Sequence, residues 1–201
     1  RQRGRGAKAN QELEEGFFDK NGKKFGEGFR EVFRGLKNPS ETMAYMTAKR
    51  TQDYEAREMK GIDPGEFSQK DLAEQGIIQF EETQPHLKEE AEKVTKFMDN
   101  QLGVLKEGGI FNDDQLKQLK EDNPNFLPFE RDRSDIPESF IKQGGGFGSP
   151  SKPLAKRTGS TRKIVDPATT IAKRQYIYNN LAGRNKTNQD ILENIAAMGN
   201  E

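Results

Sequence analysis

The sequence predicts a mainly α-helical protein, built of extended helical hairpins and a long irregular strap rich in Gly and Pro, with no significant β-sheet. Two observations support this fold class. Apolar residues recur at helical spacing behind helix-capping residues, and no stretch shows the apolar–polar alternation of a strand. The 12 Leu, 11 Ile, 4 Val and 13 Phe make up 40 of 201 residues. Chains near this level bury little apolar surface, so we expect the helices to depend on partners.

Residues 1–37 are predicted to form a basic arm and a short Phe-rich helix. Residues 1–11 are basic and aperiodic, and no regular structure is expected there. A turn at Asn21 and Gly22 precedes apolar residues whose spacing predicts a helix from about residue 26 to 36. These apolar residues are Phe25, Phe29, Phe33 and Leu36.

Residues 38–122 are predicted to form a region of helical hairpins. Asn38, with Pro39 at the first helical position and Glu41 after it, predicts a helix that runs to about residue 60. Ser68 and Asp71 open the next helix, whose apolar residues share one face. That face consists of Leu72, Ala73, Gly76, Ile77 and Phe80.

The clearest helix is predicted from about Pro85 to Glu107, with Gly108 and Gly109 as its stop. Its seam has the 4-3-4-3-4 spacing of a helix that pairs with another helix. The seam consists of Leu87, Ala91, Val94, Met98, Gln101 and Leu105. Four of these are candidate anchors of a protein interface: Leu87, Val94, Met98 and Leu105.

A capping box at Asn112 and Gln115 opens a two-turn helix, which Asn123 and Pro124 end. Residues 123–165 are then predicted to be an extended, basic linker or strap, because they hold five Pro residues and a Gly-rich run.

Two aromatic residues of this strap are candidate interface anchors. Phe126 and Phe129 lie in a stretch that Pro124 and Pro128 hold extended, so docking them costs little ordering entropy. Two docking sites remain open: the chain's own helical hairpin, or a groove on another subunit.

Residues 166–201 are predicted to form two C-terminal helices. Asp166 and Pro167 open the first, which runs to about residue 181. Thr187 with Asp190 caps the second. The apolar residues of this last helix are Ile191, Leu192, Ile195 and Met198.

The formal net charge is zero, but the charges are segregated along the chain. The net charge is +4 over residues 1–62, −10 over 63–138, +8 over 139–184 and −2 over 185–201. Blocks of opposite sign favour lengthwise association between copies, or a basic segment that faces a polyanion.

The basic segment 142–174 has two interpretations. It can bind nucleic acid independently of sequence, since its cations can neutralise phosphates without reading bases. The candidate phosphate contacts are Lys152, Lys156, Arg157, Arg162, Lys163, Lys173 and Arg174. Alternatively, it lies along the acidic helices of residues 63–138, within one subunit or between subunits. We favour the second interpretation because aromatic residues for base stacking are sparse.

No catalytic, cofactor-binding or metal-binding residue is predicted, and the segment is not predicted to be an enzyme. Residues 19–22 resemble the front of a calcium loop, but Lys24 and Arg30 stand where that loop needs Gly and a bidentate Glu. A surface turn is predicted instead. His86, the sole His, has no nucleophile partner, and we expect it at a solvated helix end.

Two further classes of segment are not predicted. The Gly run at 144–148 lacks the strand and helix that frame a phosphate-binding loop, and we interpret it as a tether. No stretch approaches the roughly 18 apolar residues of a membrane span.

The chain begins at Arg1 rather than Met, so we expect it to be part of a longer protein.

Several short motifs resemble a known family. They lie at residues 45–50, 105–110, 112–115, 123–131 and 162–167, and at Asn179 and Asn180. Over residues 39–185 their order is similar to that in the large polyvalent, or internal virion, proteins of tailed phages.

The resemblance implies a structural segment of a longer chain that is packaged in the virion and ejected with the genome into the host envelope or cytoplasm. The partners it implies are capsid, portal or core proteins, further copies of the chain, and packaged DNA. It carries over no catalytic residue, because no active-site motif of the family's enzyme domains matches.

Overall fold

The computed structural model describes residues 2–56, 70–130 and 164–198, and there it confirms the mainly helical fold. Within these residues the only sheet is a two-stranded hairpin. The elements are α1 (Gln2–Glu14), β1 (Phe17–Phe18), β2 (Lys24–Gly26), α2 (Phe29–Arg34), α3 (Pro39–Ala56), α4 (Lys70–Thr83), α5 (His86–Glu107), α6 (Asp113–Asp122) and α8 (Pro167–Met198). None of the described helices has the length and apolar content that crossing a membrane requires.

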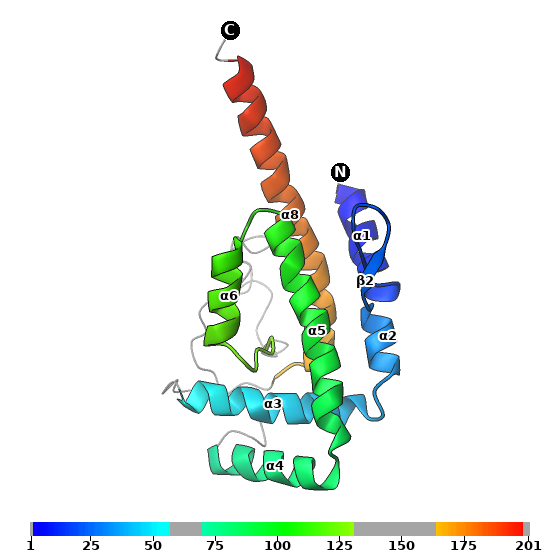
Figure 1. Ribbon diagram of the computed structural model, residues 1–201, viewed down its shortest axis with the longest axis vertical. Coiled ribbons are helices and arrows are strands. Elements are labelled where there is room, and N and C mark those ends of the chain that lie inside the picture. The colour runs from blue at the N-terminus through cyan, green and yellow to red at the C-terminus, as the bar shows by residue number, and fades with distance from the viewer. Residues whose placement is uncertain (1, 57–69, 131–163, 199–201) are drawn as a thin grey trace, which may run out of the picture.

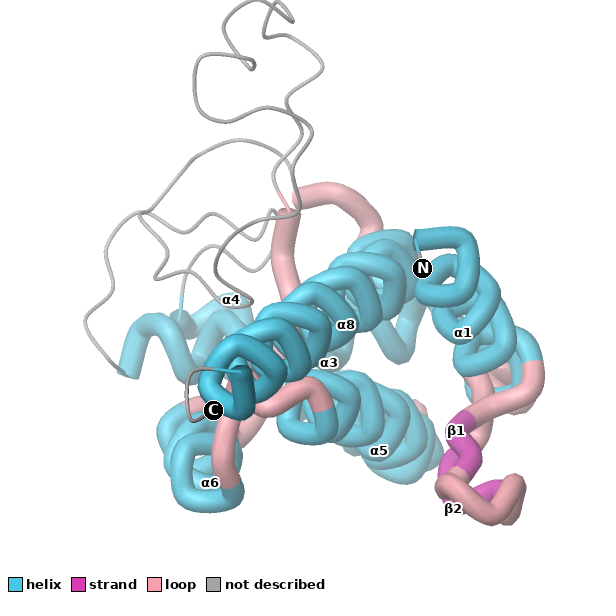
Figure 2. Tube along the Cα trace, turned by 90° about the horizontal axis from the view of Figure 1, so that it is seen from above, coloured by secondary structure: helices cyan, strands magenta, loops and turns pink. Residues whose placement is uncertain are grey.

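Helices α5 and α8 form the long axis of the molecule, and the other elements pack around them. Helices α3 and α4 lie across one end of this axis, whereas the C-terminal end of α8 extends beyond the other elements at the opposite end (Figure 1). Viewed along the axis, α1 and α5 lie beside α8 (Figure 2). The main contacts are α1 on α8, α5 on α8, and α3 on α4 and α5.

The largest core cluster is built on α5. Phe97 of α5 lies with its ring centroid 5.5 Å from that of Phe17 in β1 and 5.7 Å from that of Phe29 in α2. Val94, Met98, Leu127 and Phe129 belong to the same buried cluster. The predicted seam of α5 therefore faces the interior, and the 123–130 segment folds back onto it.

The predicted Gly-Gly stop of α5 also sets how closely α5 approaches α8. A Cβ added to Gly108 would lie 2.4 Å from the Cβ of Ala182, so only Gly fits there. Gly109 takes a positive φ of 69°, which favours Gly as a helix terminator.

The prediction of an arm without regular structure over residues 1–11 is wrong, because α1 begins at Gln2. Contacts with α8 stabilise this helix. Arg5 Nη2 donates to Gly183 O at 3.0 Å, and the Glu12 carboxylate accepts hydrogen bonds from Gln175 Nε2 at 2.6 Å and Asn179 Nδ2 at 2.5 Å. All three partners lie more than 160 residues away, so local periodicity carries no sign of them.

Replacing Glu12 with Gln is expected to change how stability depends on pH. Burial raises the pKa of Glu12 above its usual 4.5. The hydrogen bonds from Asn179 and Gln175 and the charge of Lys8 lower this pKa, but by less than burial raises it. A raised folded-state pKa stabilises the fold below the unfolded-state pKa, and this contribution is lost as the pH rises through the folded-state pKa. Relative to Glu12→Gln, the wild-type free energy of unfolding should therefore fall from about pH 4.5 upward, which urea unfolding at three pH values would measure.

Glu12→Ala is the matched control for that measurement. It removes the acceptor that both buried amides use, and relative to Glu12→Gln, which does not titrate either, it is expected to cost about 1–3 kcal/mol at every pH. Identical pH profiles for the wild type and Glu12→Gln would contradict a buried, partly desolvated carboxylate.

The local start signals of the central helices are confirmed. Asn38 Oδ1 accepts from the Glu41 amide at 3.4 Å, and Asn112 and Gln115 form the predicted capping box of α6. Helix α3 is described as far as Ala56, so its predicted end near residue 60 and the predicted cap at Ser68 lie outside the described residues.

The C-terminal region is one helix rather than the predicted two. Asp166 caps α8 as predicted, since its Oδ2 accepts from the Thr169 amide at 3.0 Å. Thr187, in contrast, does not cap a new helix. Its hydroxyl donates to the Gly183 carbonyl one turn back at 2.8 Å, and the same hydroxyl accepts from Arg5 at 3.2 Å. Without a Pro to break it, α8 continues through this region.

The turn at residues 19–22 joins β1 and β2. Asp19 Oδ1 accepts from the amides of Asn21 at 2.8 Å and Lys23 at 2.9 Å, and Gly22 takes a φ of 78°. The Asp19 carboxylate thus stabilises the predicted surface turn. The hairpin itself was not predicted, because strands of two and three residues are too short to show alternation.

Most of the predicted strap, residues 131–163, lies outside the described residues, as does the Gly run at 144–148. Its two described ends meet: Val165 N donates to Glu130 O at 2.8 Å.

Candidate functional site

A groove of about 430 Å³ lies where α3, α5 and the turn after α6 meet. Its lining combines apolar side chains with charged and polar ones. The lining residues are Tyr45, Met46 and Lys49 of α3; Lys88, Ala91, Glu92, Thr95 and Lys96 of α5; and Pro124, Asn125 and Phe126 of the turn.

Three ammonium groups and one carboxylate line this groove. Lys88, Glu92 and Lys96 recur every four residues on α5 and therefore share one face, and Lys49 approaches from α3. Within the described residues Lys96 forms no ion pair, and Glu92 pairs with neither of its lysine neighbours. The positive charge is therefore only partly compensated.

Two of the lysines are positioned by neighbouring side chains. Lys88 Nζ lies 2.7 Å from Glu81 Oε2, and Lys49 Nζ lies 5.7 Å from the centroid of the Tyr45 ring. Tyr45 OH donates to Glu81 Oε1 at 2.8 Å. These contacts hold the pKa of Glu81 below its usual value, while burial and the Glu81 carboxylate raise the pKa of Tyr45.

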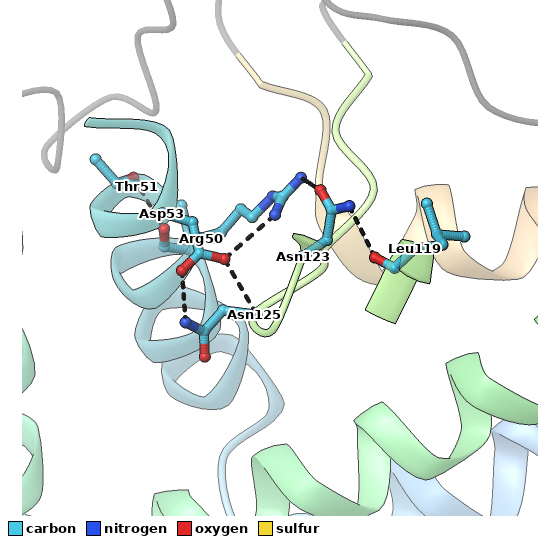
Figure 3. Close-up of polar contacts among 7 residues, drawn as sticks. Arg50, Thr51, Asp53, Leu119, Asn123 and Asn125 are labelled. Carbon is cyan, nitrogen blue, oxygen red and sulfur yellow. Dashed lines mark hydrogen bonds and ion pairs between the residues drawn. The ribbon is translucent and has the colours of Figure 1, made fainter. Parts of the chain in front are cut away.

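A polar cluster behind the groove holds the turn against α3 (Figure 3). Arg50 Nη1 lies 3.3 Å from Asp53 Oδ2, and Arg50 Nη2 donates to Asn123 Oδ1 at 3.1 Å. Asp53 in turn accepts from both the amide and the side chain of Asn125, at 3.0 and 2.8 Å. The Arg50 guanidinium also lies 5.5 Å from the centroid of the Phe126 ring.

This arrangement suits a ligand that combines negative charge with an apolar group. The ammonium groups attract anions, and Met46, Ala91 and Phe126 offer apolar contact. Among the described residues no cluster of three or more His, Cys, Asp or Glu is placed to hold a metal ion.

A second candidate surface is the projecting end of α8. Ile191, Leu192, Ile195 and Met198 are 50%, 66%, 60% and 74% exposed. They follow one another at the spacing of a single helical face, and this end of α8 lies beyond the other elements (Figure 1).

The predicted interface anchors lie mostly inside the chain's own core. Leu87, Val94, Met98, Leu105 and Phe129 are all buried, in three neighbouring clusters. They pack on segments of the same chain and leave almost no surface for a partner. Phe126, which is half-buried, is the exception, because it lines the groove.

Five of the seven candidate phosphate contacts lie outside the described residues: Lys152, Lys156, Arg157, Arg162 and Lys163. The other two contact groups of this chain. Lys173 Nζ lies 3.1 Å from Glu130 Oε2, and Arg174 Nη1 donates to Tyr178 OH at 2.9 Å. His86 is the first residue of α5.

Sequence reasoning missed the groove. The repeat of Lys88, Glu92 and Lys96 on one face of α5 was a visible signal, but such a repeat is usually a solvated charged face. Its partners on α3 and in the turn come close only through the tertiary fold. A search of protein-family models, curated proteins and solved structures finds no match for this chain.

Proposed function

We propose that this chain is a structural protein that assembles with further copies of itself through the projecting end of α8. The observation that supports this most is the group of four large apolar side chains, each at least half exposed, on that end of the helix. Exposed apolar residues gathered on one surface mark interaction sites, whereas single ones do not.

The spacing of this surface fits helix pairing. Asn188, Ile191, Ile195 and Met198 follow one another at 3-4-3 intervals, the seam of a two-stranded coiled coil, and Asn is tolerated at one such position. A helical end of this length is marginal in water when it has no packing partner. Burying an apolar side chain fully contributes about 1.5–3 kcal/mol, against an association cost of about 4–15 kcal/mol. So short a seam therefore supports weak, concentration-dependent assembly.

Sedimentation velocity of the full chain over about 10 μM to 1 mM, the range of weak complexes, tests this proposal. The wild type should self-associate, and the double variant I191Q/I195Q should stay monomeric with unchanged helical circular dichroism. The matched control is Q189N/E193Q, whose sites lie on the opposite face of the same exposed helix. A wild-type monomer at the highest concentration would contradict the proposal.

We further propose that this assembly belongs to the virion of a tailed phage. The support is the resemblance of residues 39–185 to internal virion proteins, which implies capsid, portal or core proteins as neighbours. Mass spectrometry of purified particles, before and after genome ejection, tests it. The chain should be present in full particles and lost from ejected ones.

A further inference from the structure

We propose that the groove between α3, α5 and the 123–126 turn binds an acidic peptide segment of another protein. In this complex an apolar side chain of the peptide contacts Met46 and Phe126, and its carboxylates pair with Lys49, Lys88 and Lys96. The site is separate from the exposed end of α8, so neither proposal depends on the other.

Charge complementarity points to an acidic ligand. Three ammonium groups line one groove with a single carboxylate, that of Glu92. Lys88 forms an ion pair with Glu81, and the ammonium group of Lys49 lies over the Tyr45 ring, so contacts within this chain orient both lysines. Lys96 forms no ion pair with a described residue. A carboxylate between these groups would relieve the repulsion among them.

The apolar part of the lining favours a peptide over a nucleic acid. Met46, Ala91, Pro124 and Phe126 present apolar surface that a side chain can cover. The carboxylates of Glu92 and Glu81 lie among the lysines, and they would repel the densely charged phosphates of a nucleic acid strand. A peptide carries its charges further apart and places apolar groups between them.

The groove is also preorganised. Asp53 holds the turn through two hydrogen bonds from Asn125, and Arg50 joins α3 to Asn123 at the end of α6. Phe126 is positioned beside the Arg50 guanidinium. Because these walls are fixed before binding, a ligand has little ordering cost to offset. A volume of about 430 Å³ accommodates one large side chain and its flanking backbone.

Fluorescence anisotropy with the labelled peptide acetyl-Asp-Glu-Phe-Glu-Asp tests this proposal on the full chain. The expected Kd lies between about 10 μM and 1 mM at low salt and rises at high salt, because the attraction is screened. The neutral analogue Asn-Gln-Phe-Gln-Asn and the analogue with Gly in place of Phe should each bind about tenfold more weakly.

Three protein variants distinguish binding in the groove from unspecific charge attraction. K49Q/K88Q/K96Q should weaken binding about tenfold, whereas K20Q/K23Q/K117Q, at exposed lysines away from the groove, should change it less than twofold. E92Q removes the single carboxylate of the lining and should tighten binding about threefold, a gain that misfolding cannot produce.

Three outcomes of the peptide measurements would each overturn the proposal: no binding of the peptide at about 1 mM, equal losses in the two lysine triples, or no gain with E92Q. Labelled single-stranded DNA of twelve nucleotides is run in parallel. Tighter binding of this DNA than of the peptide, lost in K49Q/K88Q/K96Q, would also overturn it and would assign the groove to nucleic acid.

Discussion

Phe97→Ala is expected to lower the free energy of unfolding by about 3–5 kcal/mol. Phe97 is only 1% exposed, and its ring contacts Phe17 of the hairpin and Phe29 of α2. Truncation leaves a cavity at the point where both elements pack on α5, so the loss exceeds the transfer term of one side chain. Single domains are typically stable by about 5–15 kcal/mol, so this change removes a large share of the total.

Guanidinium unfolding followed by circular dichroism measures this effect. Ile78→Ala is the matched control, because Ile78 is a large apolar residue that is 56% exposed on α4. That change should cost no more than about 0.5 kcal/mol. A cost below about 1 kcal/mol for Phe97→Ala would mean that the hairpin and α2 do not depend on this contact.

The elements that the sequence predicted correctly are those with local signals. The seam of α5, the cap at Asn38 and the capping box at Asn112 each involve residues within a few positions of one another. Helix α1 and the continuity of α8 depend instead on contacts such as Arg5 with Gly183. Periodicity cannot show contacts of that sequence separation.

Apolar composition underestimates the interior of this chain, because hydrogen-bonded polar side chains extend it. Gln101 Nε2 donates to Ile171 O at 2.9 Å between α5 and α8. Glu90, which is 4% exposed, accepts from the Lys37 amide at 2.8 Å and from the Thr42 hydroxyl at 2.6 Å. Buried polar groups cost little when they are paired in this way, so a count of Leu, Ile, Val and Phe omits part of the core.

The same limit applies to the candidate site. The α5 face of the groove could be read from the spacing of Lys88 and Lys96, and Phe126 was identified as a docking residue. Lys49 and the polar cluster around Arg50 could not be linked to this face of α5, because 73 positions separate Arg50 from Asn123. A site made from three distant segments becomes visible only when the fold brings them together.

Arg50→Met is expected to lower the free energy of unfolding by about 3 kcal/mol. The Arg50 side chain is 4% exposed and the Asp53 side chain 11%, so the substitution leaves a nearly buried carboxylate without its guanidinium. Met retains most of the apolar stem, which keeps the loss of packing small. Urea unfolding gives the change in stability, and anisotropy with the acidic peptide reports whether the groove keeps its shape.

The double variant R50M/D53N separates the uncompensated charge from the lost hydrogen bonds. Asn at position 53 carries no charge and keeps one oxygen that can accept from Asn125, so it loses one of the two hydrogen bonds that the carboxylate accepts there. If the stranded charge dominates, the double variant should be more stable than R50M, by about 1–2 kcal/mol, although it carries one more substitution. If the lost hydrogen bond from Arg50 to Asn123 dominates, the second substitution should lower the free energy of unfolding further than R50M alone. Only the first result is consistent with Arg50 acting mainly as the counter-ion of a nearly buried Asp53.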